Sequence, residues 1–288
     1  MLGAIIGDII GSPYEFDEYN IKTTDFPLFS EESEITDDTI MTLAVAQGLM
    51  NGKKDSQKTY DEITKCMQKL GKEYPYMSYG CNFQNWLHSN NPQPYNSYGN
   101  GSAMRVSAVA WFFDNLDDVE KFAEISALPT HNHPEGIKGA QAVASAIFLA
   151  RSEKTKSEIK DYIMKKYAYD LSKTCDEIRP TYHHVENCQE TVPQAITAFL
   201  EGGSFEEVIR LAVSLGGDSD TLTAIAGSIA EAYYPIPEDI KDRALEFLDD
   251  DLLEIYNQFQ KTFQLRMQIK LSLKELKLQT KQYKASSL

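Results

Sequence analysis

The stretch from Leu215 to Tyr234, LGGDSDTLTAIAGSIAEAYY, combines a glycine turn, a cluster of oxygen ligands and a helix. The two glycines leave the backbone free to turn tightly before the helix begins. Apolar residues then recur at helical spacing, so the pattern predicts a helix whose first turn carries Asp218, Asp220 and Thr221. One Asp or Thr at such a position is an ordinary helix cap. Capping alone does not require two aspartates and a threonine within four residues.

A second cluster of the same kind lies near the other end of the chain, in SEITDDTIMTLAVAQGLM from Ser33 to Met50. Thr36, Asp37 and Asp38 stand at the head of another run with helical spacing. Carboxylates that converge from two helix N-termini would repel one another unless cations lay among them, and oxygen ligands suit Mg²⁺ or Mn²⁺. Capping can explain either cluster alone, but the likeness between them favours a shared metal site.

The segment that begins at Gly3, GAIIGDIIGSPYEFD, places Gly3, Gly7 and Gly11 four residues apart on an apolar background. This spacing predicts a helix that packs very closely against its neighbours at the centre of the core. Asp8 lies within that helix and is interpreted as a buried hydrogen-bond acceptor. Glu15 follows the helix and is the better catalytic candidate.

Loops rich in polar and aromatic residues offer binding candidates. The composition of residues 71–100 predicts a long surface loop, and residues 172–190 predict another. The first loop ends in SYGNGSAMR, and a helix is expected from about Ser102. A glycine-rich loop that leads into a helix can present N–H groups to a phosphate, although GNG is also a common turn. Further on, His131 and His133 precede another helix. They could ligate a metal, but donation to phosphate is favoured.

Almost every segment with a clear period repeats at 3.6 residues, and nothing before residue 258 has a convincing strand pattern. The chain therefore predicts an all-α, orthogonal multi-helix bundle, with the metal site where helix N-termini converge. We divide it into a catalytic domain, residues 1–257, and a basic C-terminal extension, residues 258–288. Residues 263–273 alternate as a strand would, yet their composition favours a helix, and disorder is a third alternative. The extension is expected to serve docking or self-association rather than catalysis.

Bulk properties exclude several classes of function. The net charge of −15 argues against binding nucleic acid. No apolar run approaches the roughly 20 residues that span a membrane, and the N-terminus lacks a signal-peptide pattern, so a cytoplasmic protein is expected. The 4 cysteines form no zinc pattern and are interpreted as reduced thiols. A monomer is expected, with self-association possible through the extension.

Taken in order, the motifs GAIIGDIIGSPYEF, TDDT, SYGNGSAMR, THNHPEGIKGA and GGDSDT resemble the ADP-ribosylglycohydrolase family. This family is related to the enzyme that removes ADP-ribose from dinitrogenase reductase. The resemblance covers about residues 1–250 and implies an all-α fold that binds two Mg²⁺ or Mn²⁺ ions. Five motifs in the family's order are specific, whereas any one of them alone is not.

The resemblance implies a role for each matching residue. It implies that the metal ligands are Thr36, Asp37, Asp38, Asp218, Asp220 and Thr221. It places the catalytic roles on Glu15, Asp37 and Asp218. It places the substrate-binding roles on Ser97, Tyr98, Gly99, Asn100, Gly101 and His131. Among these, Tyr98 is our candidate for stacking on the adenine.

The activity that the resemblance implies is metal-dependent hydrolysis. Water would attack the anomeric carbon of the distal ribose and release ADP-ribose from a modified protein or a small conjugate. Gly99 stands where some members have a catalytic Asp, and SYGNGSAMR is similar to the serine-linkage branch. THNHP is similar to the arginine branch, and arginine is slightly favoured. Two alternatives stay open, a catalytically silent ADP-ribose-binding protein and a two-metal phosphoester hydrolase.

Overall fold

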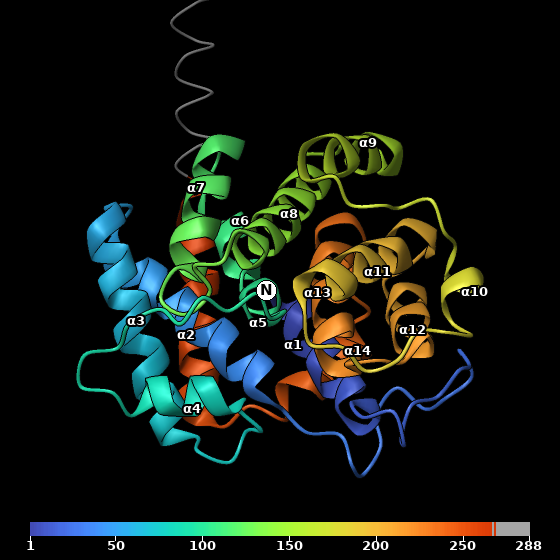
Figure 1. The fold of residues 1–288 in the computed structure, drawn as a ribbon, viewed down its shortest axis with the longest axis horizontal. Coiled ribbons are helices and arrows are strands. Elements are labelled where there is room, and N and C mark those ends of the chain that lie inside the picture. The colour runs from blue at the N-terminus through green and yellow to red at the C-terminus, as the bar shows by residue number, and fades with distance from the viewer. Residues whose placement is uncertain (267, 269–288) are drawn as a thin grey trace, which may run out of the picture.

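The computed structural model describes residues 1–266 and 268, which form helices joined by loops and contain no strand (Figure 1). The helices are α1 Leu2–Gly11, the 3₁₀ helix η1 Ser12–Tyr14, α2 Asp37–Gly52, α3 Ser56–Glu73, α4 Cys81–Leu87, α5 Gly101–Met104, α6 Ser107–Phe112, α7 Leu116–Ala127, α8 Pro134–Arg151, α9 Lys156–Tyr167, α10 Cys175–Ile178, α11 Cys188–Glu201, α12 Phe205–Leu215, α13 Ser219–Tyr233 and α14 Glu238–Leu245. The prediction of an all-α fold is confirmed. Within the described part, no helix is both long and apolar enough to cross a membrane.

Helices α1 and α13 pack together at the centre of the molecule (Figure 1). Every residue of α1 is buried. A Cβ atom built at Gly7 would lie 2.2 Å from the carbonyl oxygen of Thr223, and one built at Gly11 would lie 2.5 Å from that of Ser219. No side chain fits at such distances, so glycine is what lets the two backbones touch. The close packing predicted from the glycine spacing is confirmed.

The other helices surround this central pair. Helix α13 also contacts α8, α11 and α12, while α1 contacts α2, which pairs with α3. Figure 1 shows α2 and α3 on one side of the centre and α10, α11 and α12 on the other. The N-terminal ends of α2 and α13 are therefore both held close to α1, although they lie about 180 residues apart in the sequence.

Two of the predicted loops contain short helices. Helix α4 lies within residues 71–100, and α10 lies within residues 172–190. In α4, Phe83, Trp86 and Leu87 are buried because they share one helical face. Leu87 packs against Gly71 at the end of α3. The expectation of unbroken loops was wrong because an apolar face this short is hard to recognise among polar residues.

The C-terminal segment is helical as far as it is described. Residues 250–266 are helical, and this helix passes through the predicted boundary at residue 258. Phe259 is buried in the core, and the ring of Phe263 packs edge-on against Trp111 with 5.4 Å between centroids. The division into two domains stays a prediction. Residues 267 and 269–288, which make up most of the predicted extension, lie outside the described part. The predicted role of the extension in self-association therefore stays a prediction.

The contact between α1 and α13 predicts that Gly7→Ala destabilises the protein. Alanine improves helix propensity by roughly 0.5–1 kcal/mol. Its methyl group, however, would have to displace the backbone of α13, and such overpacking typically costs about 1–3 kcal/mol or more. A lower urea midpoint is expected. The matched control is Gly80→Ala, whose Cβ would meet nothing within 4 Å. Equal midpoints for the two variants would contradict the packing argument.

Candidate functional site

Asp8 holds the first turn of α2 in place from within α1. Its carboxylate is fully buried and accepts four hydrogen bonds, from the N–H and hydroxyl groups of Thr36 and Thr39. Burial raises the pKa of Asp8 to about 6, although these hydrogen bonds favour the charged form. The interpretation of Asp8 as a structural acceptor is confirmed. Through Asp8, α1 determines where the acidic end of α2 lies.

A left-handed glycine turn leads into α13. Gly216 has φ +71° and Gly217 has φ +80°, a region that L side chains rarely adopt. The side chain of Asn20 clamps the turn, because it accepts from the Gly217 N–H at 2.6 Å and donates to the Gly217 carbonyl at 3.0 Å. Asp218 follows at the N-cap position, but its side chain caps no backbone N–H. The Asp218 carboxylate is therefore available for a role other than capping.

Capping explains the threonine of the first cluster but not its aspartates. Thr36 caps α2 by accepting from the N–H of Asp38 at 3.2 Å. The Oδ2 atom of Asp38 accepts from the hydroxyl of Thr221 at 3.0 Å, so a hydrogen bond joins the two clusters directly. The Oδ1 atom of Asp38 is buried and has no hydrogen-bond partner among the described residues. A buried carboxylate oxygen without a partner is a candidate ligand for an ion or a water molecule.

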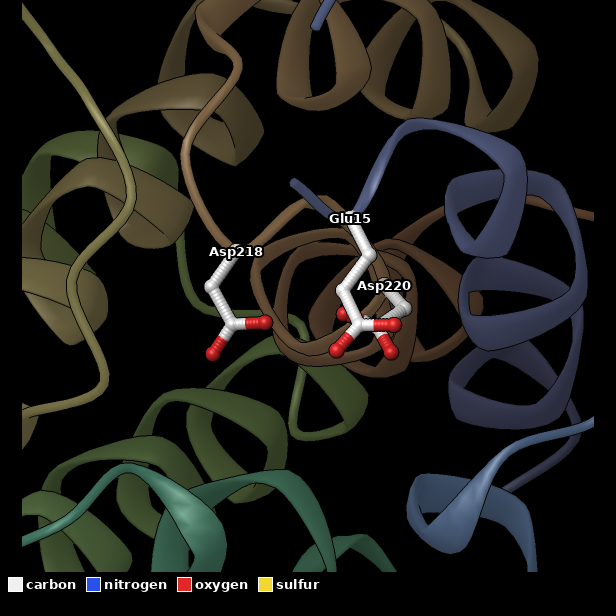
Figure 2. A group of neighbouring side chains, drawn as sticks. All are labelled: Glu15, Asp218 and Asp220. Atoms are coloured by element: carbon white, nitrogen blue, oxygen red, sulfur yellow. The ribbon is translucent and has the colours of Figure 1, made fainter. Parts of the chain in front are cut away.

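The acids of the two clusters line one cavity of about 310 Å³. Carboxylate oxygens of Glu15, Asp218 and Asp220 all lie within 4.8 Å of one another, a grouping that can hold a metal ion. Figure 2 shows the three side chains pointing into the same space, with Glu15 beside Asp220. Asp37 and Asp38 line the same cavity. The structure thus brings together acids from three separate parts of the sequence.

Burial and mutual repulsion make these carboxylates hard to ionise. Burial, followed by the charge of neighbouring acids, raises the pKa values of Asp37, Asp38 and Asp220 well above their usual range. The same causes raise the pKa of Glu15 to about 8, and burial raises that of Asp218 to about 6. Among the described residues no salt bridge involves any of the five. The five acids have no paired cation among the described residues, and one of them, Asp38, has a buried oxygen without a partner. Such a cluster fits divalent metal ions.

The glycine-rich loop also lines the cavity, but most of its N–H groups are already used. The Gly99 N–H donates to the Ser97 hydroxyl at 3.1 Å. The Asn100 N–H donates to the carbonyl of Glu186 at 2.9 Å. In the part of the chain that the structure describes, the Gly101 N–H has no acceptor. Of the three amides expected to bind phosphate, Gly101 therefore has the one that is available.

The two histidines of THNHP have different roles. His131 is buried and lines the cavity, and burial followed by the charge of Arg105 lowers its pKa well below the usual value, so its ring is neutral. His133 instead caps α8, where its Nδ1 accepts from the N–H of Glu135 at 3.1 Å. Only His131 is placed to meet a substrate.

Most of the predicted site residues line the cavity. They are Glu15, Asp37, Asp38, Ser97, Gly99, Asn100, Gly101, His131, Asp218, Asp220 and Thr221. Thr36 and Tyr98 are not among the lining residues. Thr36 lies against Asp8, and Tyr98 is 52% exposed with its ring 5.2 Å from that of His133.

The residues of the cavity wall that sequence reasoning missed include Phe83, Tyr95, Arg105 and Glu186. Arg105 ends the SYGNGSAMR motif, which was its only signal. The other three lie in segments that were predicted as loops, where no period distinguishes a residue that faces the cavity from one that faces solvent.

Comparison with known proteins identifies the family. The model of the ADP-ribosylglycohydrolase family matches residues 1–268. The human ADP-ribosylhydrolase ARH3 is 27% identical over 346 residues, covering 91% of this chain and 93% of the relative. The ADP-ribosylarginine hydrolase Tri1 of Pseudomonas putida is 25% identical over 264 residues, covering 82% of this chain and 70% of the relative.

A solved structure shows the same fold. It is described as an ADP-ribosylglycohydrolase-related protein complex and aligns with a TM-score of 0.61 at 23% identity, covering 85% of this chain and 95% of that one. The chain belongs to the ADP-ribosylglycohydrolase family and is an ADP-ribosyl glycohydrolase.

Proposed function

We propose that this enzyme uses two Mg²⁺ or Mn²⁺ ions to remove ADP-ribose from a modified side chain or a small conjugate. The observation that carries the proposal is the convergence of Glu15, Asp218 and Asp220 in one cavity. The same cavity offers the Gly101 N–H and the neutral His131 as hydrogen-bond donors. It therefore combines ligands for cations with donors for an anion, which suits a substrate that carries both a ribose and a diphosphate.

We assign the ions to Thr36, Asp37, Asp38, Asp218, Asp220 and Thr221. The Thr36 oxygen donates to Asp8 and accepts from the Asp38 N–H, which leaves one lone pair for a cation. When bound, the ions would neutralise these carboxylates and hold the ribose hydroxyls. Other side chains orient the ligands, because Asn100 donates to Asp218 at 2.7 Å and Thr221 donates to Asp38.

Glu15 is the residue to which we assign proton transfer. It lies half-buried at the end of η1, with a carboxylate oxygen close to those of Asp218 and Asp220. In the metal-free protein, burial followed by the charge of Asp220 raises the pKa of Glu15 to about 8, so this side chain can hold a proton near neutral pH, as a group that takes and gives a proton must. Glu15 would orient or deprotonate the attacking water, or protonate the leaving group. Asp37 and Asp218 complete the proposed catalytic set by orienting the ribose with the ions.

We place the diphosphate against Gly101 and His131, in the loop formed by Ser97, Gly99 and Asn100. Backbone N–H groups and a neutral imidazole can bind phosphate oxygens without a lysine. Tyr98 stays our proposed contact for the adenine, because its ring is half exposed and its neighbours Ser97 and Gly99 line the cavity. Phe83 and Tyr95 add aromatic surface within the cavity.

For the acceptor we propose an arginine side chain. Glu186 lines the cavity with an exposed carboxylate, one oxygen of which lies 3.2 Å from Nε2 of His184, so the other oxygen remains available to a cationic group. A cationic guanidinium that leaves from beside Glu15 would therefore meet a complementary charge, whereas a serine hydroxyl would not. The similarity to Tri1, whose name gives ADP-ribosylarginine as its substrate, supports the same choice.

Replacing Glu15 by Gln should abolish turnover while ADP-ribose still binds. The amide keeps the size of the side chain but cannot transfer the proton, and such groups typically contribute about 10²- to 10⁴-fold. Release of ADP-ribose from a modified protein measures the rate, and calorimetry measures binding. Glu18→Gln, an exposed acid of the same segment, is the control. Binding lost in step with turnover would contradict the catalytic assignment, and AMP as the product would favour phosphoester hydrolysis.

Metal binding should appear directly in thermal unfolding. At a Mn²⁺ concentration 100 times Kd, the wild type should gain about 2.7 kcal/mol of stability over the protein in EDTA. Asp220→Asn should lose this gain. In EDTA, however, the variant should be more stable than the wild type at pH 7, because the amide replaces a carboxyl group whose ionisation is opposed by burial and by the neighbouring acids. Asp25→Asn, an exposed acid, is the control. An unchanged Mn²⁺ response in Asp220→Asn would exclude Asp220 as a ligand.

The acceptor proposal predicts a higher kcat/KM for an arginine-linked than for a serine-linked ADP-ribosyl peptide of the same sequence. Glu186→Gln should lower the ratio of the two values several-fold, because the variant removes the charge that the guanidinium meets. Glu190→Gln, an exposed acid outside the cavity wall, should leave the ratio unchanged. Faster release from serine by the wild type would refute the assignment of the acceptor.

A further inference from the structure

Arg105 is a buried cation in a cavity wall whose other charged side chains are acids. Its side chain is 1% exposed, and it is the one lysine or arginine among the residues that line the cavity. Among the described residues it forms no salt bridge, and its Nε has no hydrogen-bond partner. A buried charge without a paired carboxylate is costly to keep. Its position therefore calls for an explanation in terms of what the guanidinium contacts.

The guanidinium contacts the hydroxyl of Thr130. Its Nη2 donates to the Thr130 Oγ1 at 2.8 Å and to the carbonyl of Ser126 at 3.3 Å. The same Oγ1 lies 2.7 Å from Nδ1 of His131. A guanidinium can only donate, so the Thr130 oxygen must accept from Arg105 and its single proton remains available. If the Thr130 hydroxyl donates this hydrogen bond to Nδ1 of His131, Nδ1 is the acceptor and carries no proton. The single ring proton of the neutral imidazole is then on Nε2.

We propose that Arg105 is a positioning residue that acts through Thr130 to hold His131 as the Nε2–H tautomer, the form that donates to the substrate's diphosphate. The role assigned to His131 rests on the function proposed above. The buried positive charge also lies behind the part of the cavity where the anion would bind.

The surroundings of the second ring nitrogen agree with this role. A Cβ atom built at Gly99 would lie 3.4 Å from Nε2 of His131, and one built at Gly101 would lie 3.5 Å from it. Nε2 therefore faces the loop whose Gly101 N–H has no acceptor among the described residues. Two donors on neighbouring groups can serve one phosphate only if Nε2 carries the proton. The tautomer thus decides whether this part of the cavity attracts or repels an anion.

Tyr95 offers the competing arrangement. Its hydroxyl lies beside Thr130, so Thr130 could instead donate to Tyr95 while Nδ1–H of His131 donates to Thr130. Two facts favour donation from the Thr130 hydroxyl to Nδ1 of His131. A hydroxyl that accepts from a cation becomes a better donor and a poorer acceptor. An imidazole nitrogen is also a stronger acceptor than a phenol oxygen. The phenol can still use the second lone pair of Thr130.

The ¹⁵N chemical shifts of the His131 ring test the proposal, because they separate a protonated from a bare ring nitrogen. In the folded, ligand-free wild type we expect a bare Nδ1 and a protonated Nε2. Thr130→Val should give a mixture of tautomers and weaken ADP-ribose binding about tenfold, the loss of roughly one hydrogen bond. Thr130→Ser keeps the hydroxyl and should restore both properties. Tyr95→Phe should leave the tautomer unchanged.

Variants at Arg105 test whether the guanidinium causes Thr130 to donate to His131. Arg105→Met frees Thr130 to donate or accept, so a population with Nδ1–H should appear, whereas Arg105→Lys keeps a group that only donates. If Arg105→Met fails to fold, the ¹⁵N shifts of His131 in the wild type, in Thr130→Val and in Thr130→Ser still test the proposal. A protonated Nδ1 in the wild type, or shifts in Thr130→Val that match the wild type, would overturn the proposal. Because the shifts are recorded without ligand, they stand apart from the proposed function, which fails if wild-type protein does not bind ADP-ribose.

Discussion

The contact between the backbones of α1 and α13 is the constraint on which the rest of the structure depends. Glycines at every fourth position of α1 allow carbonyl oxygens of α13 to approach to distances at which a methyl group would clash. A pair of helices packed this closely leaves little freedom of rotation or translation. The helix that supplies Asp8 and the helix that begins with the second acidic cluster are therefore fixed relative to each other before any metal or substrate binds.

From this pair the acidic site is built by short connections. Asp8 reaches out of α1 to hold the first turn of α2, and η1 continues α1 directly to Glu15. The glycine turn held by Asn20 places Asp218 at the start of α13. Each acid thus lies within one turn of a rigid helix end. Buried carboxylates repel one another, and the packing of the core maintains this arrangement against that repulsion.

The cavity contains two opposed electrostatic environments. Acids that lack paired cations suit divalent ions, while the buried Arg105, the neutral His131 and the Gly101 N–H suit an anion. A molecule in which a diphosphate is joined to a ribose carries both an anion and hydroxyl groups that can bind metal ions, so it suits both environments. Because both environments are built into the protein in advance, the substrate would have one orientation that satisfies them.

The sequence by itself determined the helical class, the central glycine-rich helix and the two acidic clusters, because helical period, glycine spacing and helix-start signals are local properties. Tertiary structure alone decided what shares the cavity. It placed Tyr95 and Glu186 in the wall, left Tyr98 outside the lining, and committed the Asn100 N–H to Glu186. It also gave neighbouring histidines different roles. These outcomes depend on contacts between segments distant in sequence, which no local pattern encodes.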